Sequence, residues 1–507
     1  MPELARLTSG RLLARNTLIN LAGEVVPFLV ALFAIPALVG GIGVDRYGVL
    51  TLSMLVVGYF GLFDFGLGRA AAKFIAEAAA SGDRDAIPGL FWTSLYMMLV
   101  LGAAAGILEA ALAPYLVRDA LRIPPALRPE SVRAFYLLAL SMPLVISAGT
   151  LGGTLASFQR FDLINAVRVP SGIFSYLGPL AVIPFSHAID AMVAAMVVGR
   201  VAGWLASFAL CIRIAPELWR RRRPARAVLR PMLSFGGWVT VSGIVGPLMS
   251  YFDRFFIGAM LSMAAVSYYT VPFQITGKLG VVPGAMGGVV FAAFSGSFAN
   301  DPGRAALIFE RAARYTLLAL FAPVLLIVAF APEGLSLWLG PSFAAHSAPV
   351  LRLVAIATFI NCLAWTPYGL VQAAHRPDLT AKFHLAEVPF YLAALFWMLP
   401  RYGIAGAAIA YLARVAADAA LLFVAARWLM PAAACAVNRL AALAFAGLAV
   451  LAAAAIPMEL AVRLLFVAIV LVLSVAAGWT LLLEPEEKSF IRGYVRLPRI
   501  LAVETRE

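Results

Sequence analysis

The sequence predicts an all-α membrane protein with about 14 transmembrane helices. Its composition and the length of its apolar runs are the two observations that predict this class. The chain has 507 residues, of which 63% are hydrophobic and 13% charged, whereas an ordinary soluble domain carries roughly 25% charged residues. Continuous apolar runs of about 20 residues, long enough to cross a bilayer, recur from Thr17 to Leu483. Because the runs are continuous rather than alternating, the spans are helices and not barrel strands, and a soluble enzyme is excluded.

The first apolar run follows three arginines and is too long for the core of a signal peptide, so we expect an uncleaved first span. Most of the 39 Lys and Arg residues fall in alternate connecting segments, which predicts that these segments and both termini are cytoplasmic. The net charge of +13 is therefore interpreted as a topology signal and an attraction to anionic lipid, with no nucleic-acid partner. The predicted spans are 17–40, 48–67, 89–113, 131–153, 166–185, 188–212, 233–260, 264–295, 313–338, 347–372, 381–400, 403–428, 438–456 and 461–483.

An internal repeat divides the first twelve spans into two halves. The segment Gln159–Leu163 follows the fourth span, and the similar segment His375–Leu379 follows the tenth span 216 residues later. Six spans per half make the halves parallel repeats, an arrangement typical of transporters that bind cargo at the repeat interface. We predict an N-terminal six-helix bundle at 1–212, a basic cytoplasmic linker at 213–231, a C-terminal six-helix bundle at 232–430, two additional transmembrane helices at 431–483 and a cytoplasmic tail at 484–507.

A motif at the end of the second span suggests a family. Residues 64–70 read Asp-Phe-Gly-Leu-Gly-Arg-Ala, and Tyr251–Gly258 and the repeated Arg-x-Asp-Leu turns fit the same pattern. These segments resemble the polysaccharide-export, Wzx-type oligosaccharide-lipid flippases of the multidrug/oligosaccharidyl-lipid/polysaccharide (MOP) exporter superfamily. The resemblance covers the first twelve spans and implies a V-shaped, MATE-like transporter with two extra C-terminal helices. It further implies flipping of polyprenyl-diphosphate-linked oligosaccharide repeat units from the cytoplasmic to the periplasmic leaflet of a bacterial inner membrane. Such flipping would serve surface polysaccharide or O-antigen biosynthesis, by alternating access.

Cationic and polar residues inside the predicted spans are the candidate contacts for a diphosphate. A charge at the bilayer centre costs about 2.5 kcal/mol or more unless it faces a cavity or a partner. Lys278 lies near mid-depth in the eighth span, and Gln274 is one turn before it on the same face. Arg254 and Arg352, nearer the outside ends of the seventh and tenth spans, would offer bidentate donors. Arg200 in the sixth span is a further candidate, and for all three arginines a structural ion pair or packing role stays open.

Three carboxylates are candidate ion-coupling residues: Glu24 in the first span, Asp253 beside Arg254, and Glu387 in the eleventh span. A buried carboxyl group can exchange a proton, and a desolvated one can coordinate sodium. The alternative is a polar residue whose hydrogen bonds are satisfied between helices. We therefore expect no cofactor other than H⁺ or Na⁺ as the coupling ion.

The cytoplasmic end of the second span combines Asp64 with Arg69 and Lys73. Their proximity in the sequence favours the salt bridges of a cytoplasmic gate over proton transport by Asp64. The sequence contains no Walker motif, HExxH, GxSxG or metal-ligand cluster, so we expect no catalytic residue, no metal site and no enzymatic activity.

Three other functions stay open. The two added helices resemble those of lipid II flippases, but the first span carries Glu24 where those proteins usually carry arginines. A MATE-type cation-coupled drug antiporter would need a cavity dominated by acids, whereas intramembrane cations are in excess here. A membrane glycosyltransferase or polymerase usually has a long outside loop, and the longest one here is 114–130. The expected partners are the polyprenyl-diphosphate-linked glycan, membrane lipids, a polysaccharide polymerase and other export components.

Overall fold

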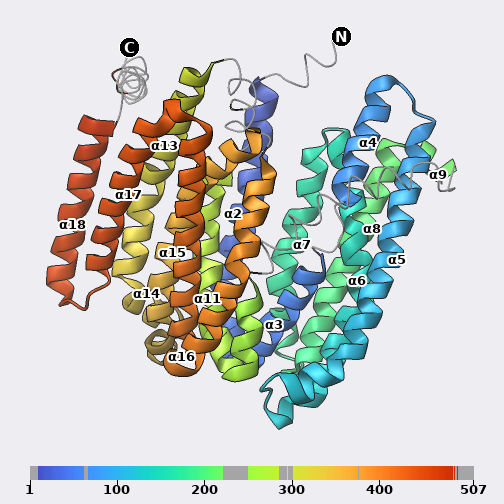
Figure 1. Cartoon of the computed structure of the whole chain (residues 1–507). Coiled ribbons are helices and arrows are strands. Elements are labelled where there is room, and N and C mark those ends of the chain that lie inside the picture. The colour runs from blue at the N-terminus through green and yellow to red at the C-terminus, as the bar shows by residue number, and fades with distance from the viewer. Residues whose placement is uncertain are drawn as a thin grey trace, which may run out of the picture. The chain divides into compact units, whose positions relative to one another are not determined.

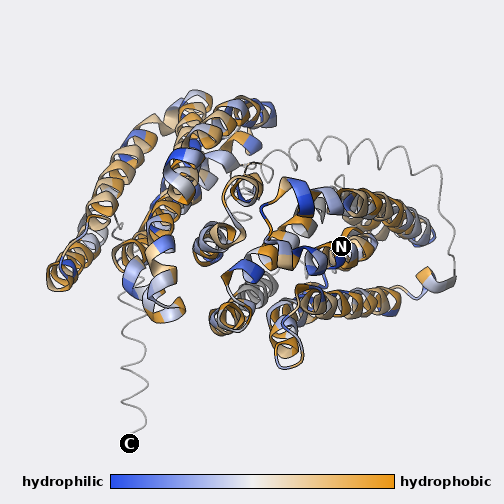
Figure 2. Ribbon diagram, turned by 90° about the horizontal axis from the view of Figure 1, so that it is seen from below, coloured by the Kyte–Doolittle hydropathy of each residue, from blue (hydrophilic) through white to orange (hydrophobic). Residues whose placement is uncertain are grey.

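The computed structural model describes residues 10–61, 67–220, 249, 251–284, 294, 301–374, 376–482, 485 and 488. These residues are almost entirely helical and contain no β-strand, which confirms the predicted all-α class. Nine of the helices described are long and apolar enough to cross a membrane. Hydrophobic residues recur along most of the helices (Figure 2), and large side chains such as Leu140, Phe390 and Val475 are exposed. Exposed apolar surface on this scale is typical of helices that face lipid, so the chain is a multi-pass membrane protein.

The chain folds into two compact units. Unit 1 comprises Met1–Val281, Leu335–Val350 and Pro377–Arg414, and unit 2 comprises Val282–Gly334, Leu351–Arg376 and Val415–Glu507. The predicted domain boundaries at residues 212 and 430 stay predictions.

Unit 1 is built on helical hairpins in which α5 packs on α6, α6 on α8, and α7 on both α2 and α8 (Figure 1). Phe91, Met98 and Leu151 lie in the core that these helices share. The described elements up to residue 280 are α2 (Gly10–Ile42), α3 (Val44–Gly61), α4 (Leu67–Ser81), α5 (Ala86–Tyr115), the π-helical turn η1 (Leu116–Ala120), the 3-10 turn η2 (Pro125–Leu127), α6 (Arg128–Ser157), α7 (Phe161–Val182), α8 (Ile189–Ile214), α9 (Glu217–Arg220), α11 (Met263–Thr276) and the 3-10 turn η3 (Gly277–Gly280).

One buried carboxylate links the first turns of three of these helices. Glu130 at the start of α6 accepts a hydrogen bond from Arg46 Nε of α3 at 3.1 Å and from the backbone amide of Ile189 of α8 at 2.9 Å. The α2–α3, α5–α6 and α7–α8 connections therefore lie together at the end of unit 1 that contains Glu130. The α6–α7 turn at residues 158–160 lies at the other end.

The remaining elements include the two helices that extend the predicted twelve. Both α17 and α18 pack on α13 within unit 2, where Phe309 and Leu440 belong to one core. The helices α14, α15 and α16 contribute residues to both units. The bounds are α13 (Pro302–Ala329), α14 (Ala331–Leu339), α15 (Pro341–Ala373), α16 (Pro377–Leu429), the 3-10 turn η4 (Pro431–Ala433), α17 (Ala434–Ala454), α18 (Leu460–Ala477) and the π-helical turn η5 (Gly478–Leu482).

Two helices differ in extent from the predicted spans. The helix α13 begins at Pro302 and not near residue 313, because Asp301 caps it by accepting a hydrogen bond from the Arg304 amide at 2.9 Å and proline suits the first helical position. The long helix α16 contains both predicted spans 381–400 and 403–428, which meet at Gly403, where φ is 56° and ψ is −144°. The predicted seventh span, the basic linker and the cytoplasmic tail fall largely outside the described residues, whereas the predicted eighth span is described up to residue 284.

Candidate functional site

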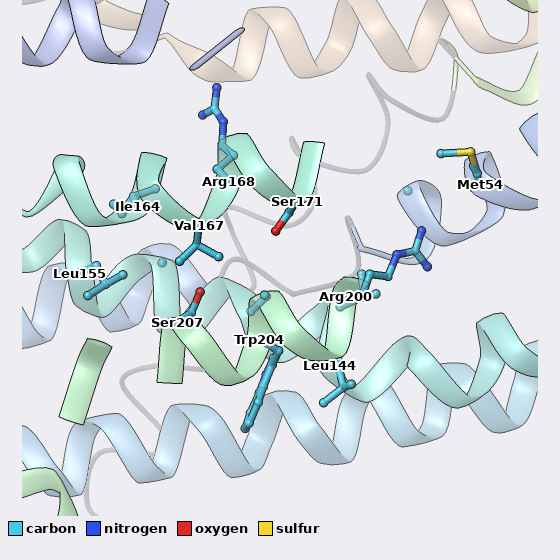
Figure 3. Close-up of a pocket in the computed structure, with 15 residues that line it drawn as sticks. Met54, Leu144, Leu155, Ile164, Val167, Arg168, Ser171, Arg200, Trp204 and Ser207 are labelled. Carbon is cyan, nitrogen blue, oxygen red and sulfur yellow. The ribbon is translucent and has the colours of Figure 1, made fainter. Parts of the chain in front are cut away.

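A cavity of about 520 Å³ lies within unit 1, between α3, α6, α7 and α8. It extends from Met54 and Arg200 at one end to Leu155 and Ile164, beside the α6–α7 turn, at the other (Figure 3). Most of its wall is apolar, and the hydroxyl groups of Ser171 and Ser207 are among its few polar groups. The full lining is Met54, Gly58, Leu144, Val145, Ala148, Gly152, Leu155, Ile164, Val167, Arg168, Ser171, Arg200, Gly203, Trp204 and Ser207.

Two arginines are the charged residues of this lining, and they lie on different helices. Arg200 of α8 is partly buried, donates a hydrogen bond from Nη1 to Ser141 Oγ at 3.4 Å, and points toward Met54 (Figure 3). Arg168 of α7 is exposed and its guanidinium points away from Leu155 (Figure 3). Trp204 is fixed by a 2.8 Å hydrogen bond from Nε1 to Ser147 Oγ. An apolar wall with a partly buried guanidinium suits an amphipathic anion.

Of the predicted substrate-binding residues, Arg200 thus lines the cavity, and α8 is one of the nine candidate membrane spans. Sequence reasoning missed Arg168, although it lies within the predicted fifth span. It also missed Glu109 of α5, a buried carboxylate on which the charge of Arg200 acts. The criterion that found the other candidates, an ionisable residue inside an apolar run, applies equally to both.

The predicted residues Arg254 and Asp253 form a buried ion pair. Asp253 is 0% exposed and Arg254 is 3% exposed, and Nη1 of the arginine lies 2.8 Å from Oδ1 of the aspartate. Tyr269 donates a hydrogen bond to Asp253 Oδ2 at 2.6 Å, and the guanidinium carbon of Arg254 lies 4.0 Å from the ring centre of Phe273. The role predicted for each residue stays a prediction, while these contacts show that each charge of the pair has a partner inside the fold.

A second buried pair joins Glu387 to Arg414 within α16, with 3.8 Å between the guanidinium and the carboxylate. Arg414 also lies over the rings of Tyr391 and Tyr411, at 5.7 Å and 5.2 Å from their centres. The ring of Tyr411 packs edge-on against the ring of Phe273, which Arg254 also contacts, with 4.9 Å between the two ring centres. Two of the three predicted ion-coupling carboxylates therefore lie beside an arginine.

The other predicted substrate-binding residues lie apart from the cavity lining. Gln274 accepts a hydrogen bond from the Tyr47 hydroxyl at 3.2 Å, which joins α11 to α3. Lys278 is half-buried in η3. Arg352 of α15 belongs to unit 2, where its Nε donates to the carbonyl oxygen of Val328 at 3.2 Å.

The gate residues are only partly within the described part of the chain. Lys73 is exposed on α4 and lies 3.9 Å from Glu77. Asp64 lies outside the described residues, and so do the side chains of Arg69 and Glu24. Among the residues described, no group of three His, Cys, Asp or Glu side chains could hold a metal ion.

The helices α3 and α11 pack tightly at the end of unit 1 that holds Glu130. The amide of Ala264 donates to Asp45 Oδ1 at 3.1 Å, and Ser267 Oγ donates to the carbonyl oxygen of Val44 at 2.6 Å. Gly48 lies against the backbone carbonyl of Met263, with no room for a Cβ atom. The cavity, in contrast, extends toward the α6–α7 turn.

Comparison with known proteins gives consistent results. Residues 13–298 match the family model described as "Polysaccharide biosynthesis protein". The chain is 31% identical over 414 residues to a Shigella flexneri protein described as "Putative O-antigen transporter", covering 80% of this chain and 96% of that protein.

Solved structures show the same fold. A multidrug resistance MATE family transporter of the MOP superfamily, in an inward-facing conformation, matches with a TM-score of 0.70 and 16% identity over 82% of this chain and 98% of that one. The lipid II flippase MurJ, in an inward closed conformation, matches with a TM-score of 0.68 and 10% identity over 91% of this chain and 98% of that one. At these identities the likeness concerns the fold alone. The family match, which covers more than half of the chain, and the Shigella flexneri relative show that the chain belongs to the polysaccharide biosynthesis protein family.

Proposed function

We propose that this protein flips polyprenyl-diphosphate-linked oligosaccharide repeat units from the cytoplasmic to the periplasmic leaflet of a bacterial inner membrane, for surface polysaccharide or O-antigen assembly. The observation that carries the proposal is the partly buried Arg200, which lies in the wall of an apolar cavity and on a candidate membrane span. The name of the Shigella flexneri relative supports the same class of cargo.

The chemistry of the cavity suits the three parts of this cargo. A guanidinium binds phosphate oxygens through two parallel hydrogen bonds, so Arg200 would hold the diphosphate. The hydroxyl groups of Ser171 and Ser207 offer hydrogen-bond partners to a sugar. The polyprenyl tail would stay in the bilayer, so no free energy is spent on removing it from lipid.

Direction and topology belong to the same proposal. The protein would alternate between two access states, with an H⁺ or Na⁺ gradient biasing the direction and with both termini in the cytoplasm. A polysaccharide polymerase and other export components would receive the flipped repeat unit.

Two alternatives make different predictions for the same cavity. A drug antiporter would move organic cations, which Arg200 and Arg168 repel. A lipid II flippase would move a cargo with the same diphosphate, and the MurJ match covers 91% of this chain, although its 10% identity supports the fold alone.

The test is translocation of a fluorescent polyprenyl-diphosphate oligosaccharide in proteoliposomes. Arg200→Gln removes one charge-assisted interaction, worth about 1.5–3 kcal/mol, so we expect flipping at subsaturating cargo to fall by at least about tenfold. Arg439→Gln is the matched control, because Arg439 is exposed on α17 and pairs with Glu310 in unit 2.

Three results would contradict the proposal. Undiminished flipping by Arg200→Gln would show that the cavity does not bind the diphosphate through Arg200. Extrusion of cationic dyes without lipid movement would favour the drug antiporter. Faster movement of lipid II than of any other repeat unit would favour the peptidoglycan precursor as cargo.

A further inference from the structure

Glu109 is a carboxylate without the partners that a buried carboxylate needs. It lies on α5, within a candidate membrane span, and its exposed fraction is 1%. Among the described residues, neither of its two carboxylate oxygens has a hydrogen-bond partner. An isolated carboxylate in such a place costs several kcal/mol, and a proton or a nearby cation removes that cost.

The packing of α5 places Glu109 inside the protein and not against lipid. Gly106, one turn earlier, lies so close to the carbonyl oxygen of Ala139 that α6 leaves no room for a Cβ atom. Ala113, one turn later on the same face, is 0% exposed. The part of α6 that packs here buries Phe135 at 0% exposure, so the surroundings are apolar.

Arg200 is the charged side chain whose field acts on Glu109, among the residues that the structure describes. The two side chains are not joined by a hydrogen bond, and Arg200 instead contacts Ser141 and the cavity. The other charged side chains described on the elements packed against α5 do not face Glu109. Lys73 and Glu77 on α4 pair with each other, and Arg118 and Asp119 on η1 are exposed. On α6, Arg128, Glu130 and Arg133 are bonded to other groups, and Glu217 lies on α9, which packs beside Trp92 about 25 Å along α5.

We propose that Glu109 is a proton-binding site linked to cargo binding through Arg200. When Glu109 carries a proton, Arg200 is available to the diphosphate of the cargo. When Glu109 is ionised, it attracts the same guanidinium and weakens the hold on the diphosphate. The proposal rests on the proposed function, because it takes the diphosphate as the ligand of Arg200.

The linkage has a definite sign. Two anions, the diphosphate and the Glu109 carboxylate, compete for one cation, so protonation of Glu109 strengthens cargo binding. Because linkage is reciprocal, cargo binding must also draw a proton onto Glu109. Asp253 and Glu387 differ in this respect, since each lies beside an arginine that does not line the cavity.

The probe for the test is a short-chain polyprenyl diphosphate linked to one sugar. Each of its phosphorus atoms carries one ester bond, the shared anhydride bond and a single strongly acidic hydroxyl, so its charge stays fixed over the range in which buried carboxyl groups titrate, about pH 5 to 9. Its Kd is measured by calorimetry on the full-length protein in detergent. We expect the Kd to rise about fivefold or more with increasing pH, and Glu109→Gln to keep the low-pH affinity throughout. Asp119→Asn, which changes an exposed carboxylate on η1, serves as the control and should behave like the unaltered protein.

Two further measurements separate the linkage from a structural effect. Arg200→Gln should weaken binding and abolish its pH dependence, whereas Arg168→Gln should preserve the pH dependence. In weakly buffered solution, the unaltered protein should take up protons when the probe binds, and neither Glu109→Gln nor Arg200→Gln should. Where Glu109→Gln does not fold, the Arg200→Gln comparison and the proton uptake of the unaltered protein decide.

The outcomes distinguish the two proposals. If the unaltered protein binds the probe with an affinity independent of pH, or Glu109→Gln keeps the full pH dependence, the linkage is wrong and the proposed function stands. If the unaltered protein binds no probe at any pH, the proposed function fails and the linkage fails with it.

Discussion

Removing one partner of the buried Asp253–Arg254 pair should be far more damaging than removing both. Asp253→Leu leaves Arg254, at 3% exposure, without the carboxylate 2.8 Å away. A buried charge that loses its partner costs about 3–5 kcal/mol, whereas replacing a whole buried pair with apolar residues is often neutral or stabilising. The hydroxyl of Tyr269 also loses its acceptor, which costs about 1–3 kcal/mol more.

The assay is a thermodynamic cycle on the free energy of unfolding, measured by SDS titration in mixed micelles. We expect Asp253→Leu to be the least stable variant. The double variant Asp253→Leu/Arg254→Met, combined with Tyr269→Phe, should return to within about 1 kcal/mol of the unaltered protein.

Flipping by the same variants tests the role of Arg254. Because the pair and the Phe273 ring occupy Arg254 in the structure, we expect the stable triple variant to keep its flipping activity. A triple variant as unstable as Asp253→Leu alone would refute the energetic reasoning. A stable triple variant without flipping would instead show that Arg254 contacts cargo, as the sequence predicts.

Two further predictions concern other contacts. In Gly48→Ala the added Cβ meets the Met263 carbonyl, so α3 and α11 must separate, at a cost of about 1–3 kcal/mol. Hydrogen exchange at the start of α11 should accelerate in this variant and not in Gly58→Ala, where the added atom meets nothing within 4 Å; equal exchange in both would contradict the contact. Arg463, which is 7% exposed on α18, donates one hydrogen bond to Glu333 and another to the carbonyl oxygen of Met458. Arg463→Ala should therefore accelerate exchange across residues 460–477, reflecting a loss of about 1.5–3 kcal/mol, and unchanged exchange there would show that apolar packing alone holds α18.

The membrane class could be predicted from the sequence because burial in lipid leaves a direct signal in composition. Helix ends were harder to predict where a helix continues beyond its apolar run. The first turns of α13 are interrupted by the charged residues Arg304, Glu310 and Arg311, and only the Asp301-Pro302 cap signals its start. The non-helical backbone at Gly403 lies at the boundary between the predicted spans 381–400 and 403–428.

The candidate site was predictable by residue type but not by pairing. Arg200 stands out as a charge in an apolar run, and Glu109 satisfies the same criterion. Which charges meet is decided by long-range packing. Arg414 lies beside Glu387, 27 residues earlier and across the break at Gly403, and no local spacing rule reaches that far.

The contacts of Glu130 constrain how this part of the protein can move. One carboxylate ties the first turn of α6 to Arg46 of α3 and to the amide of Ile189 in α8. Side chains and backbone at that end cannot slide past one another without leaving a buried charge unpaired. We therefore expect any motion of these helices to pivot about the Glu130 end and to grow along the helices toward the α6–α7 turn, where the cavity ends.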